Sequence, residues 1–360
     1  MLADVFEWLL RWAHEHSGEG LPQGTPPSLL TVSQSVSVLI AGHFLRMTEL
    51  VNRALAFVCE HFLRVVFLPL DLTGLADDLT HYLQSHLAVD TLETAWVLSH
   101  AADEVARRMQ AASGAAEPPG SQEVAEQGRR VRLAVNKLYR AKLQAMVAEE
   151  DGLLACCGVC GSVYATRHGP LLPCPRARMF VDFRGRVVTR HVADAAWTFA
   201  RHMADLRQQR LSWRTVYWRT WGAMQAYWCR RCQQWFSLTH VGHCVHHPGQ
   251  GLFGPGKNSG VYPCCGGQAA RFGGGGAPGC CSQDHQWPDD LAGPPGAEGE
   301  PARAPDAATL DMFRRHRRLI ELPFSSNGTG PGTAGAGSGQ SGEDGKVAMS
   351  RCGAEHAWDR

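Results

Sequence analysis

Eight cysteine and histidine residues lie in one stretch of the chain at spacings that chelate metal ions. They form four pairs in series: Cys229-x2-Cys232, Cys244-x2-His247, Cys264-Cys265, and Cys280 with His285. Zinc takes four thiolate or imidazole ligands in a tetrahedron, and a two-residue spacer lets one turn direct two side chains at the same ion. Eight ligands suffice for two closed sites, so the stretch predicts two structural zinc ions. The spacing leaves open which pairs share an ion.

A third zinc site is predicted further upstream. Cys157 and Cys160 supply one pair and Cys174 a third ligand. Either Cys156 or His168 is a candidate for the fourth position, because both lie close to these cysteines in the sequence.

Other thiol and imidazole groups are interpreted as non-ligands. His240, His243 and His246 are expected to be loop residues or hydrogen-bond partners of the ligands, and Cys59 a small core residue on the apolar side of a helix. Asp284 is expected to orient the neighbouring His285 ring as a hydrogen-bond acceptor.

The cysteine content and the N-terminus favour metal over disulfides. Thirteen cysteines are an odd number, and the first twelve residues lack the cationic start of a secretory signal. No stretch has the roughly 18 uncharged apolar residues of a membrane helix. We therefore expect an intracellular protein, nuclear and/or cytoplasmic, whose thiols are reduced.

The net charge of +1 gives no global attraction to nucleic acid. Two local segments are basic, residues 129–142 and 314–318. They support an alternative hypothesis, in which the chain is a zinc protein that binds nucleic acid through these segments.

Sequence motifs of enzymes are absent. There is no His-x-Glu with a later Pro-Cys-x-x-Cys of zinc deaminases, no His-Glu-x-x-His, no Walker loop and no nucleophile elbow. We predict that the chain is not an enzyme.

Apolar periodicity predicts a mostly α fold with a small zinc-stabilised α+β region. Helices are expected in residues 1–15, 33–62 (with a break between Gly42 and Thr48, the latter a possible cap), 73–110, 124–149 and 311–322. Residues 179–191 predict a β-hairpin with its turn at Arg184-Gly185. The Gly/Ser/Ala tract after Ser325 predicts a disordered C-terminal tail.

An aromatic series predicts one further helix. Trp213, Tyr217, Trp221, Met224 and Trp228 recur every three or four residues. The stripe is interpreted as an aromatic core beneath a zinc site rather than as a surface that stacks bases.

Two resemblances to known families narrow the predicted fold and function. Cys244-x2-His247-Pro248-Gly249, Tyr262-Pro263-Cys264-Cys265 and Gly279-Cys280 with His285 resemble the second half of a CHORD zinc module. The resemblance departs upstream, where two residues separate Cys229 from Cys232 and a CHORD has four.

A longer match resembles the family of the SANT and BTB domain regulator of class switch recombination. It is carried by the run Ser-Trp-Arg-x-Val-Tyr-Trp-Arg-x-Trp-Gly from Ser212 to Gly222, by the Cys/His pairs that follow, and upstream by Val36-Ser37-Val38-Leu39-Ile40 with His43-Phe44-Leu45-x-Met47-x3-Val51. The resemblance covers roughly residues 1–287.

The resemblance implies an organisation and a function. It implies the C-terminal half of a BTB-like domain in residues 1–70, a helical linker region in 71–150, a Cys/His-rich zinc region in 151–287 and a mostly disordered tail in 288–360. The family implies a regulator that restrains immunoglobulin class switching, with protein partners such as corepressor complexes. Its BTB domain forms homodimers; since the interface half is not among these residues, we expect a monomer or nonspecific self-association.

Overall fold

The protein divides into two compact units. The computed structural model describes residues 2–16, 29–112, 120–148, 153–174, 176, 180–181, 187–188, 190–271, 279–287 and 305–322. One unit comprises Met1–Glu149 with Ser212–Arg214, and the other comprises Glu150–Leu211 with Thr215–Arg360. This division lies beside the predicted start of the zinc region, whereas the segments predicted as 1–70 and 71–150 belong to one unit.

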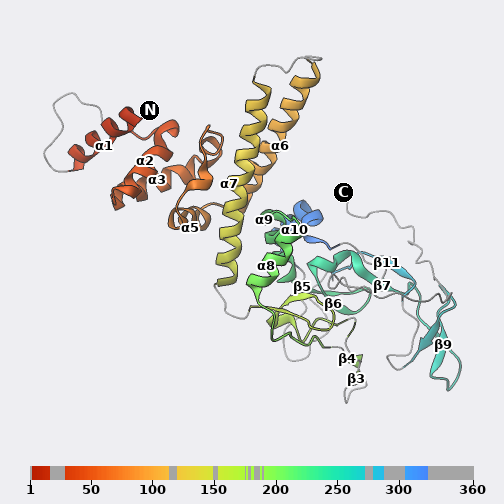
Figure 1. Ribbon diagram of the computed structural model, residues 1–360. Helices are drawn as coiled ribbons and strands as arrows, with labels where there is room; N and C mark the ends of the chain where they lie inside the picture. The colour runs from red at the N-terminus through yellow and green to blue at the C-terminus, as the bar shows by residue number, and fades with distance from the viewer. Residues whose placement is uncertain are drawn as a thin grey trace, which may run out of the picture. The chain divides into compact units, whose positions relative to one another are not determined.

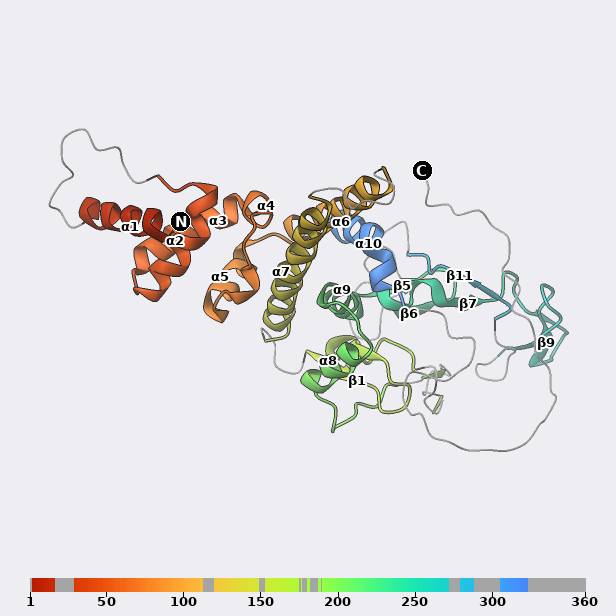
Figure 2. The same cartoon turned by 45° about the horizontal axis from the view of Figure 1, so that its top comes forward.

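The first unit is helical throughout its described elements. These are α1 (Leu2–His16), α2 (Val32–Phe44), α3 (Thr48–Glu60), α4 (Phe62–Val65), the short 3-10 helix η1 (Leu72–Gly74), α5 (Asp77–His86), α6 (Val89–Ala112) and α7 (Ser121–Ala148) (Figure 1). Apolar side chains of α1, α2 and α3 share one core cluster, which includes Trp8, Trp12, Val38 and Leu50, and Figure 2 shows α1 beside α2.

The predicted break between α2 and α3 is confirmed, but its predicted cap is wrong. The chain reverses at Arg46, whose φ of 57° is in the left-handed region. Thr48 is the first residue of α3 rather than its cap, and Met47 holds the cap position without a side-chain hydrogen bond. A helix start stabilised by packing can do without a capping side chain.

Helices α6 and α7 form a long antiparallel pair (Figure 1). A side chain at Gly128 of α7 would lie 2.8 Å from the backbone oxygen of Ser99 in α6, so glycine permits this close approach. Arg132 of α7 binds the carboxylate of Asp103 in α6 at 2.7 Å.

A buried ion pair lies in the same unit. Glu93 of α6 is 6 % exposed and accepts hydrogen bonds from Arg214 Nε at 2.8 Å and from the Tyr139 hydroxyl at 2.5 Å. The Arg214 guanidinium also lies over the Trp96 ring, 5.1 Å from its centroid. Both charges are therefore paired and hydrogen-bonded, as buried charges must be.

The second unit combines short strands with three helices in its described residues. Its elements are β1 (Leu154–Cys156), β2 (Val163–Ala165), η2 (Thr166–His168), β3 (Phe180–Val181), β4 (Val187–Val188), α8 (Phe199–Gln208), α9 (Trp213–Ala223, which begins in the first unit), β5 (Ala226–Cys229), β6 (Gln234–Ser237), η3 (Leu238–His243), β7 (Cys244–His246), β8 (Leu252–Phe253), β9 (Ser259–Val261), β10 (Gln268–Ala270), β11 (Cys281–Gln283) and α10 (Ala307–Ile320). The strands pair as β1–β2, β3–β4, β5–β6 and β7–β11, and β8, β9 and β10 form a three-stranded sheet.

The structure confirms the mostly α fold with a small α+β region. The predicted hairpin in residues 179–191 corresponds to the antiparallel pair β3–β4, whose turn lies outside the described residues. The predicted disordered tract after Ser325 also lies outside them.

The single aromatic helix predicted from Trp213 to Trp228 is wrong at its C-terminal end. Helix α9 stops at Ala223, and Trp228 lies in β5, opposite Trp235 of β6. Cys229 and Cys232 lie at the turn of this hairpin, so the chain must leave the helix before them. The most deeply buried aromatic residue of α9 is Trp218, which is outside the predicted stripe.

Helix α10 lies within the predicted tail and packs against the zinc region. Its predicted range, 311–322, overlaps the observed Ala307–Ile320. The His316 ring stacks on Trp218 with centroids 4.0 Å apart, and Phe313 contacts Trp287 edge-on. Ile320 is fully buried against Gly222 of α9. Part of the tail is thus an ordered element of this unit.

Candidate metal centres

Among the described residues, twelve cysteine and histidine side chains converge in three groups of four, all in the second unit. The first site comprises Cys157, Cys160, Cys174 and His191; the second Cys229, Cys232, Cys244 and His285; the third His247, Cys264, Cys265 and Cys280. In each group the candidate ligand atoms lie within 4.8 Å of one another. All eleven residues predicted from the sequence fall into these groups, and His191 is added.

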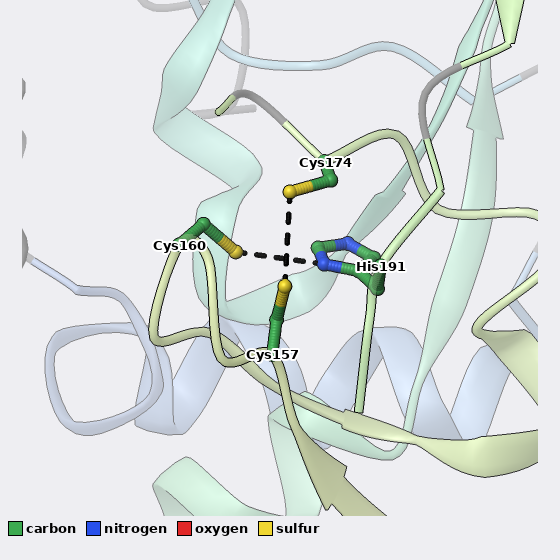
Figure 3. Close-up of side chains that lie close together, drawn as sticks. All are labelled: Cys157, Cys160, Cys174 and His191. Carbon is green, nitrogen blue, oxygen red and sulfur yellow. Dashed lines mark hydrogen bonds between the residues drawn. The ribbon is translucent and has the colours of Figure 1, made fainter. Parts of the chain in front are cut away.

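Interatomic distances test whether zinc fits. A tetrahedral ion with Zn–S bonds of about 2.3 Å and Zn–N bonds of about 2.0–2.1 Å places two sulfurs about 3.8 Å apart, and a sulfur and a nitrogen about 3.5 Å apart. In the first site the Sγ atoms of Cys157 and Cys174 are 3.8 Å apart, and Cys160 Sγ is 3.5 Å from His191 Nδ1 (Figure 3). The four side chains point at a common centre (Figure 3), so the site fits zinc.

The second and third sites give similar distances. In the second, Cys229 and Cys244 Sγ are 3.9 Å apart and Cys232 Sγ is 3.4 Å from His285 Nδ1. In the third, His247 Nδ1 lies 3.6 Å from Cys264 Sγ and 3.5 Å from Cys265 Sγ, and the Sγ atoms of Cys264 and Cys280 are 3.5 Å apart. Each group provides four soft or borderline donors and no carboxylate, the donor set of a structural zinc site.

Three similar turns present the paired cysteines. In each, a backbone N–H donates to the carbonyl oxygen four residues earlier: Gly161 to Cys157 at 2.8 Å, Gln233 to Cys229 at 2.9 Å, and Gly266 to Tyr262 at 2.8 Å. The donor residue has positive φ each time: 75°, 55° and 70°. Two of the three are glycine, which adopts this conformation at no steric cost. The tight turn directs two thiols to one point.

The order of the ligands nests the third site inside the second. Cys244 begins β7 and belongs to the second site, whereas His247, directly after β7, belongs to the third. The return strand β11 has Cys280 of the third site before it and His285 of the second site after it. The antiparallel ribbon β7–β11 thus connects the two sites, and its register determines which candidate ligands converge in each group.

Each candidate histidine ligand stacks on an aromatic ring. The pairs and their centroid distances are His191 with Tyr164 (4.7 Å), His285 with Phe236 (4.1 Å) and His247 with Tyr262 (3.6 Å). Stacking restricts rotation of the imidazole, so Nδ1 stays directed at the centre of its site.

Neither Cys156 nor His168 is the fourth member of the first site. Cys156 ends β1, and successive side chains in a strand point to opposite faces. Its Sγ therefore faces the Gly161 carbonyl at 3.5 Å, while Cys157 faces the site. The fourth member, His191, follows the β3–β4 pair, and no chelating spacing in the sequence identified it.

The remaining candidates lie outside the three groups, as predicted. His243 Nε2 is 3.1 Å from the Leu322 carbonyl oxygen, and His246 Nδ1 is 3.3 Å from that of Cys244. His240 is mostly buried, and this desolvation lowers its pKa to about 4. Cys59 is a residue of helix α3, and its burial raises the pKa of its thiol.

Asp284 has a different partner from the one predicted. Its carboxylate accepts two hydrogen bonds from the Arg317 guanidinium of α10, at 2.6 and 2.7 Å. This carboxylate raises the pKa of Arg317. Asp284 thus joins α10 to the segment beside His285 instead of orienting the imidazole.

Solvent exposure separates the third site from the other two. Cys157, Cys174, Cys229 and Cys244 are buried, whereas Cys264 and Cys265 are exposed.

No model of a known protein family matches the chain, and no solved structure matches it significantly. Among the described residues, no helix is both long and apolar enough to cross a membrane.

Proposed function

We propose that the chain is a non-enzymatic regulatory protein whose interaction surfaces are held in place by three structural zinc ions. The observation that carries this proposal is the composition of the three groups, four cysteine or histidine side chains each and no carboxylate. Four protein ligands close a tetrahedral site, so no position is left for an activated water or a substrate. Zinc bound in this way supplies folding energy rather than catalysis.

The regulatory part of the proposal rests on the sequence resemblance. The residues shared with the family that restrains class switch recombination include Trp213 and Arg214 at the start of α9 and the ligand pairs of the second and third sites. We infer that the chain restrains immunoglobulin class switching by recruiting a corepressor complex, and that it acts inside the cell.

Nucleic-acid binding is the weaker alternative, because many basic side chains of the two candidate segments contact groups of the protein itself. Lys137 donates to the Thr73 carbonyl oxygen at 2.9 Å and Lys142 to that of Gln84 at 2.6 Å. Burial also lowers the pKa of Lys142. Arg132 and Arg317 bind carboxylates. A steep loss of micromolar binding to generic DNA with rising salt would favour the alternative.

A tethered-reporter assay tests the proposal. Fusion of the full chain to a heterologous DNA-binding module is expected to lower transcription of a reporter gene several-fold. Cys229→Ser, which removes a buried ligand, should abolish the effect, and Cys59→Ser should preserve it. Unchanged transcription with the unsubstituted chain, at equal protein abundance, would contradict corepressor recruitment.

A further inference from the structure

The third site differs from the first two in the accessibility of its thiols. Cys264 and Cys265 are exposed and Cys280 is half-buried, whereas the first and second sites each contain two fully enclosed cysteines. Zinc keeps its cysteine ligands as thiolates, and oxidation of cysteine follows thiolate character and exposure. An oxidant dissolved in water therefore reaches the sulfurs of the third site first.

Two of these sulfurs are also close enough to bond to each other. Cys264 Sγ lies 3.5 Å from Cys280 Sγ, whereas the sulfur pairs Cys157–Cys174 and Cys229–Cys244 are 3.8 and 3.9 Å apart. A disulfide needs a separation of about 2.05 Å, so the two sulfurs must approach by about 1.5 Å. Cys264 lies in the turn after β9 and Cys280 just before β11, so the bond would join two separate segments. The adjacent Cys264 and Cys265 would instead close a small strained ring.

We propose that the third site is a redox-labile zinc site, in which hydrogen peroxide oxidises Cys264 and Cys280 to a disulfide and releases the ion while the first and second sites keep theirs. The inference rests on the proposed structural zinc. One thiolate attacks a peroxide oxygen, the O–O bond breaks, and a sulfenic acid and hydroxide form. The second thiolate attacks the sulfenic sulfur and displaces a second hydroxide. Two electrons pass from sulfur to peroxide, two protons convert the hydroxides to water, and Zn²⁺ leaves because two of its four ligands are gone.

The nested order of the ligands limits the consequences to one loop. The third site closes the segment between β7 and β11, which contains the sheet of β8, β9 and β10. The second site lies at the other end of the ribbon and keeps all four ligands. Oxidation is therefore expected to loosen the sheet of β8, β9 and β10 and to leave α9, β5 and β6 folded.

The test uses the full chain at neutral pH. Native mass spectrometry counts zinc before and after submillimolar peroxide, and differential alkylation with peptide mapping assigns the oxidised cysteines. We expect a loss of one ion of three, a peptide linked through Cys264 and Cys280, and release at least about tenfold faster than from the buried sites. A thiol reductant with added zinc should restore the third ion.

Cys280→His provides the matched variant, because imidazole remains a zinc ligand but cannot form the disulfide. It is expected to keep three ions and to resist peroxide. Simultaneous loss of all three ions, prior oxidation of Cys157 or Cys229, or retention of all zinc by the unsubstituted chain would overturn the inference. A chain that lacks zinc before peroxide is added would instead refute the proposed structural metal.

Discussion

Cys229→Ser is expected to remove two zinc ions from the chain and to unfold the ribbon between them. Cys229 is fully buried, and a serine hydroxyl does not replace a thiolate as a zinc ligand. Binding of a structural zinc ion stabilises the fold around it by about 10–16 kcal/mol, which is as large as the whole stability of a small unit. Loss of the second site frees one end of the β7–β11 ribbon, and His247 and Cys280 of the third site are joined to that ribbon.

Because the third site is nested inside the second, substitutions at the two sites should remove different numbers of zinc ions. Cys264→Ser removes a ligand of the third site, whose residues lie between those of the second site in the sequence, so this variant should keep two ions. Cys156→Ser, an adjacent thiol outside the three groups, should keep all three. Metal content by mass spectrometry, together with limited proteolysis between β5 and β11, measures the difference. Equal losses of one ion in Cys229→Ser and Cys264→Ser would contradict the nested arrangement.

Arg214→Ala is expected to destabilise the helical unit by about 3–5 kcal/mol, because it leaves a buried charge without a partner. Glu93 is almost fully enclosed, and Arg214 forms hydrogen bonds to both of its carboxylate oxygens. Tyr139 supplies one neutral donor, which does not compensate the charge. Urea denaturation followed by the helical circular dichroism signal reports the free energy of unfolding.

Two further variants make this measurement specific. Arg129→Ala removes an exposed ion pair with Glu126, which solvent screens, and should change the free energy of unfolding little. Glu93→Leu combined with Arg214→Met removes both buried charges and should recover most of the loss. An Arg214→Ala variant no less stable than Arg129→Ala would show that the Glu93 carboxylate is not held as a buried charge.

Spacing in the sequence predicted most of the candidate metal ligands because the arrangement of two side chains by one turn is a local property. Cys229-x2-Cys232 and Cys157-x2-Cys160 each lie in a tight turn, and periodicity likewise located the break between α2 and α3. The pairing of Cys244 with His285 was not predictable from spacing, since it depends on the register of β7 with β11.

Features that depend on distant contacts were missed. His191 lies with Cys174 in the first site although the β3–β4 pair lies between them in the sequence, and no sequence pattern indicates that they come together. The aromatic periodicity continued to Trp228 although the helix stops at Ala223, because a strand residue happened to fall at helical spacing. Helix α10 was predicted as an element, but its packing on Trp218 was not.

Replacement of zinc by cobalt tests the central claim, three closed four-ligand sites, most directly. Cobalt titrated into the metal-free chain during refolding is expected to bind at three equivalents, because three groups of four ligands are present. The visible bands should be intense, as tetrahedral thiolate-rich coordination requires, and should not change when cyanide is added. Binding of fewer than three equivalents, or a spectrum that shifts with cyanide while the metal stays bound, would reveal an incomplete or open site and contradict the account.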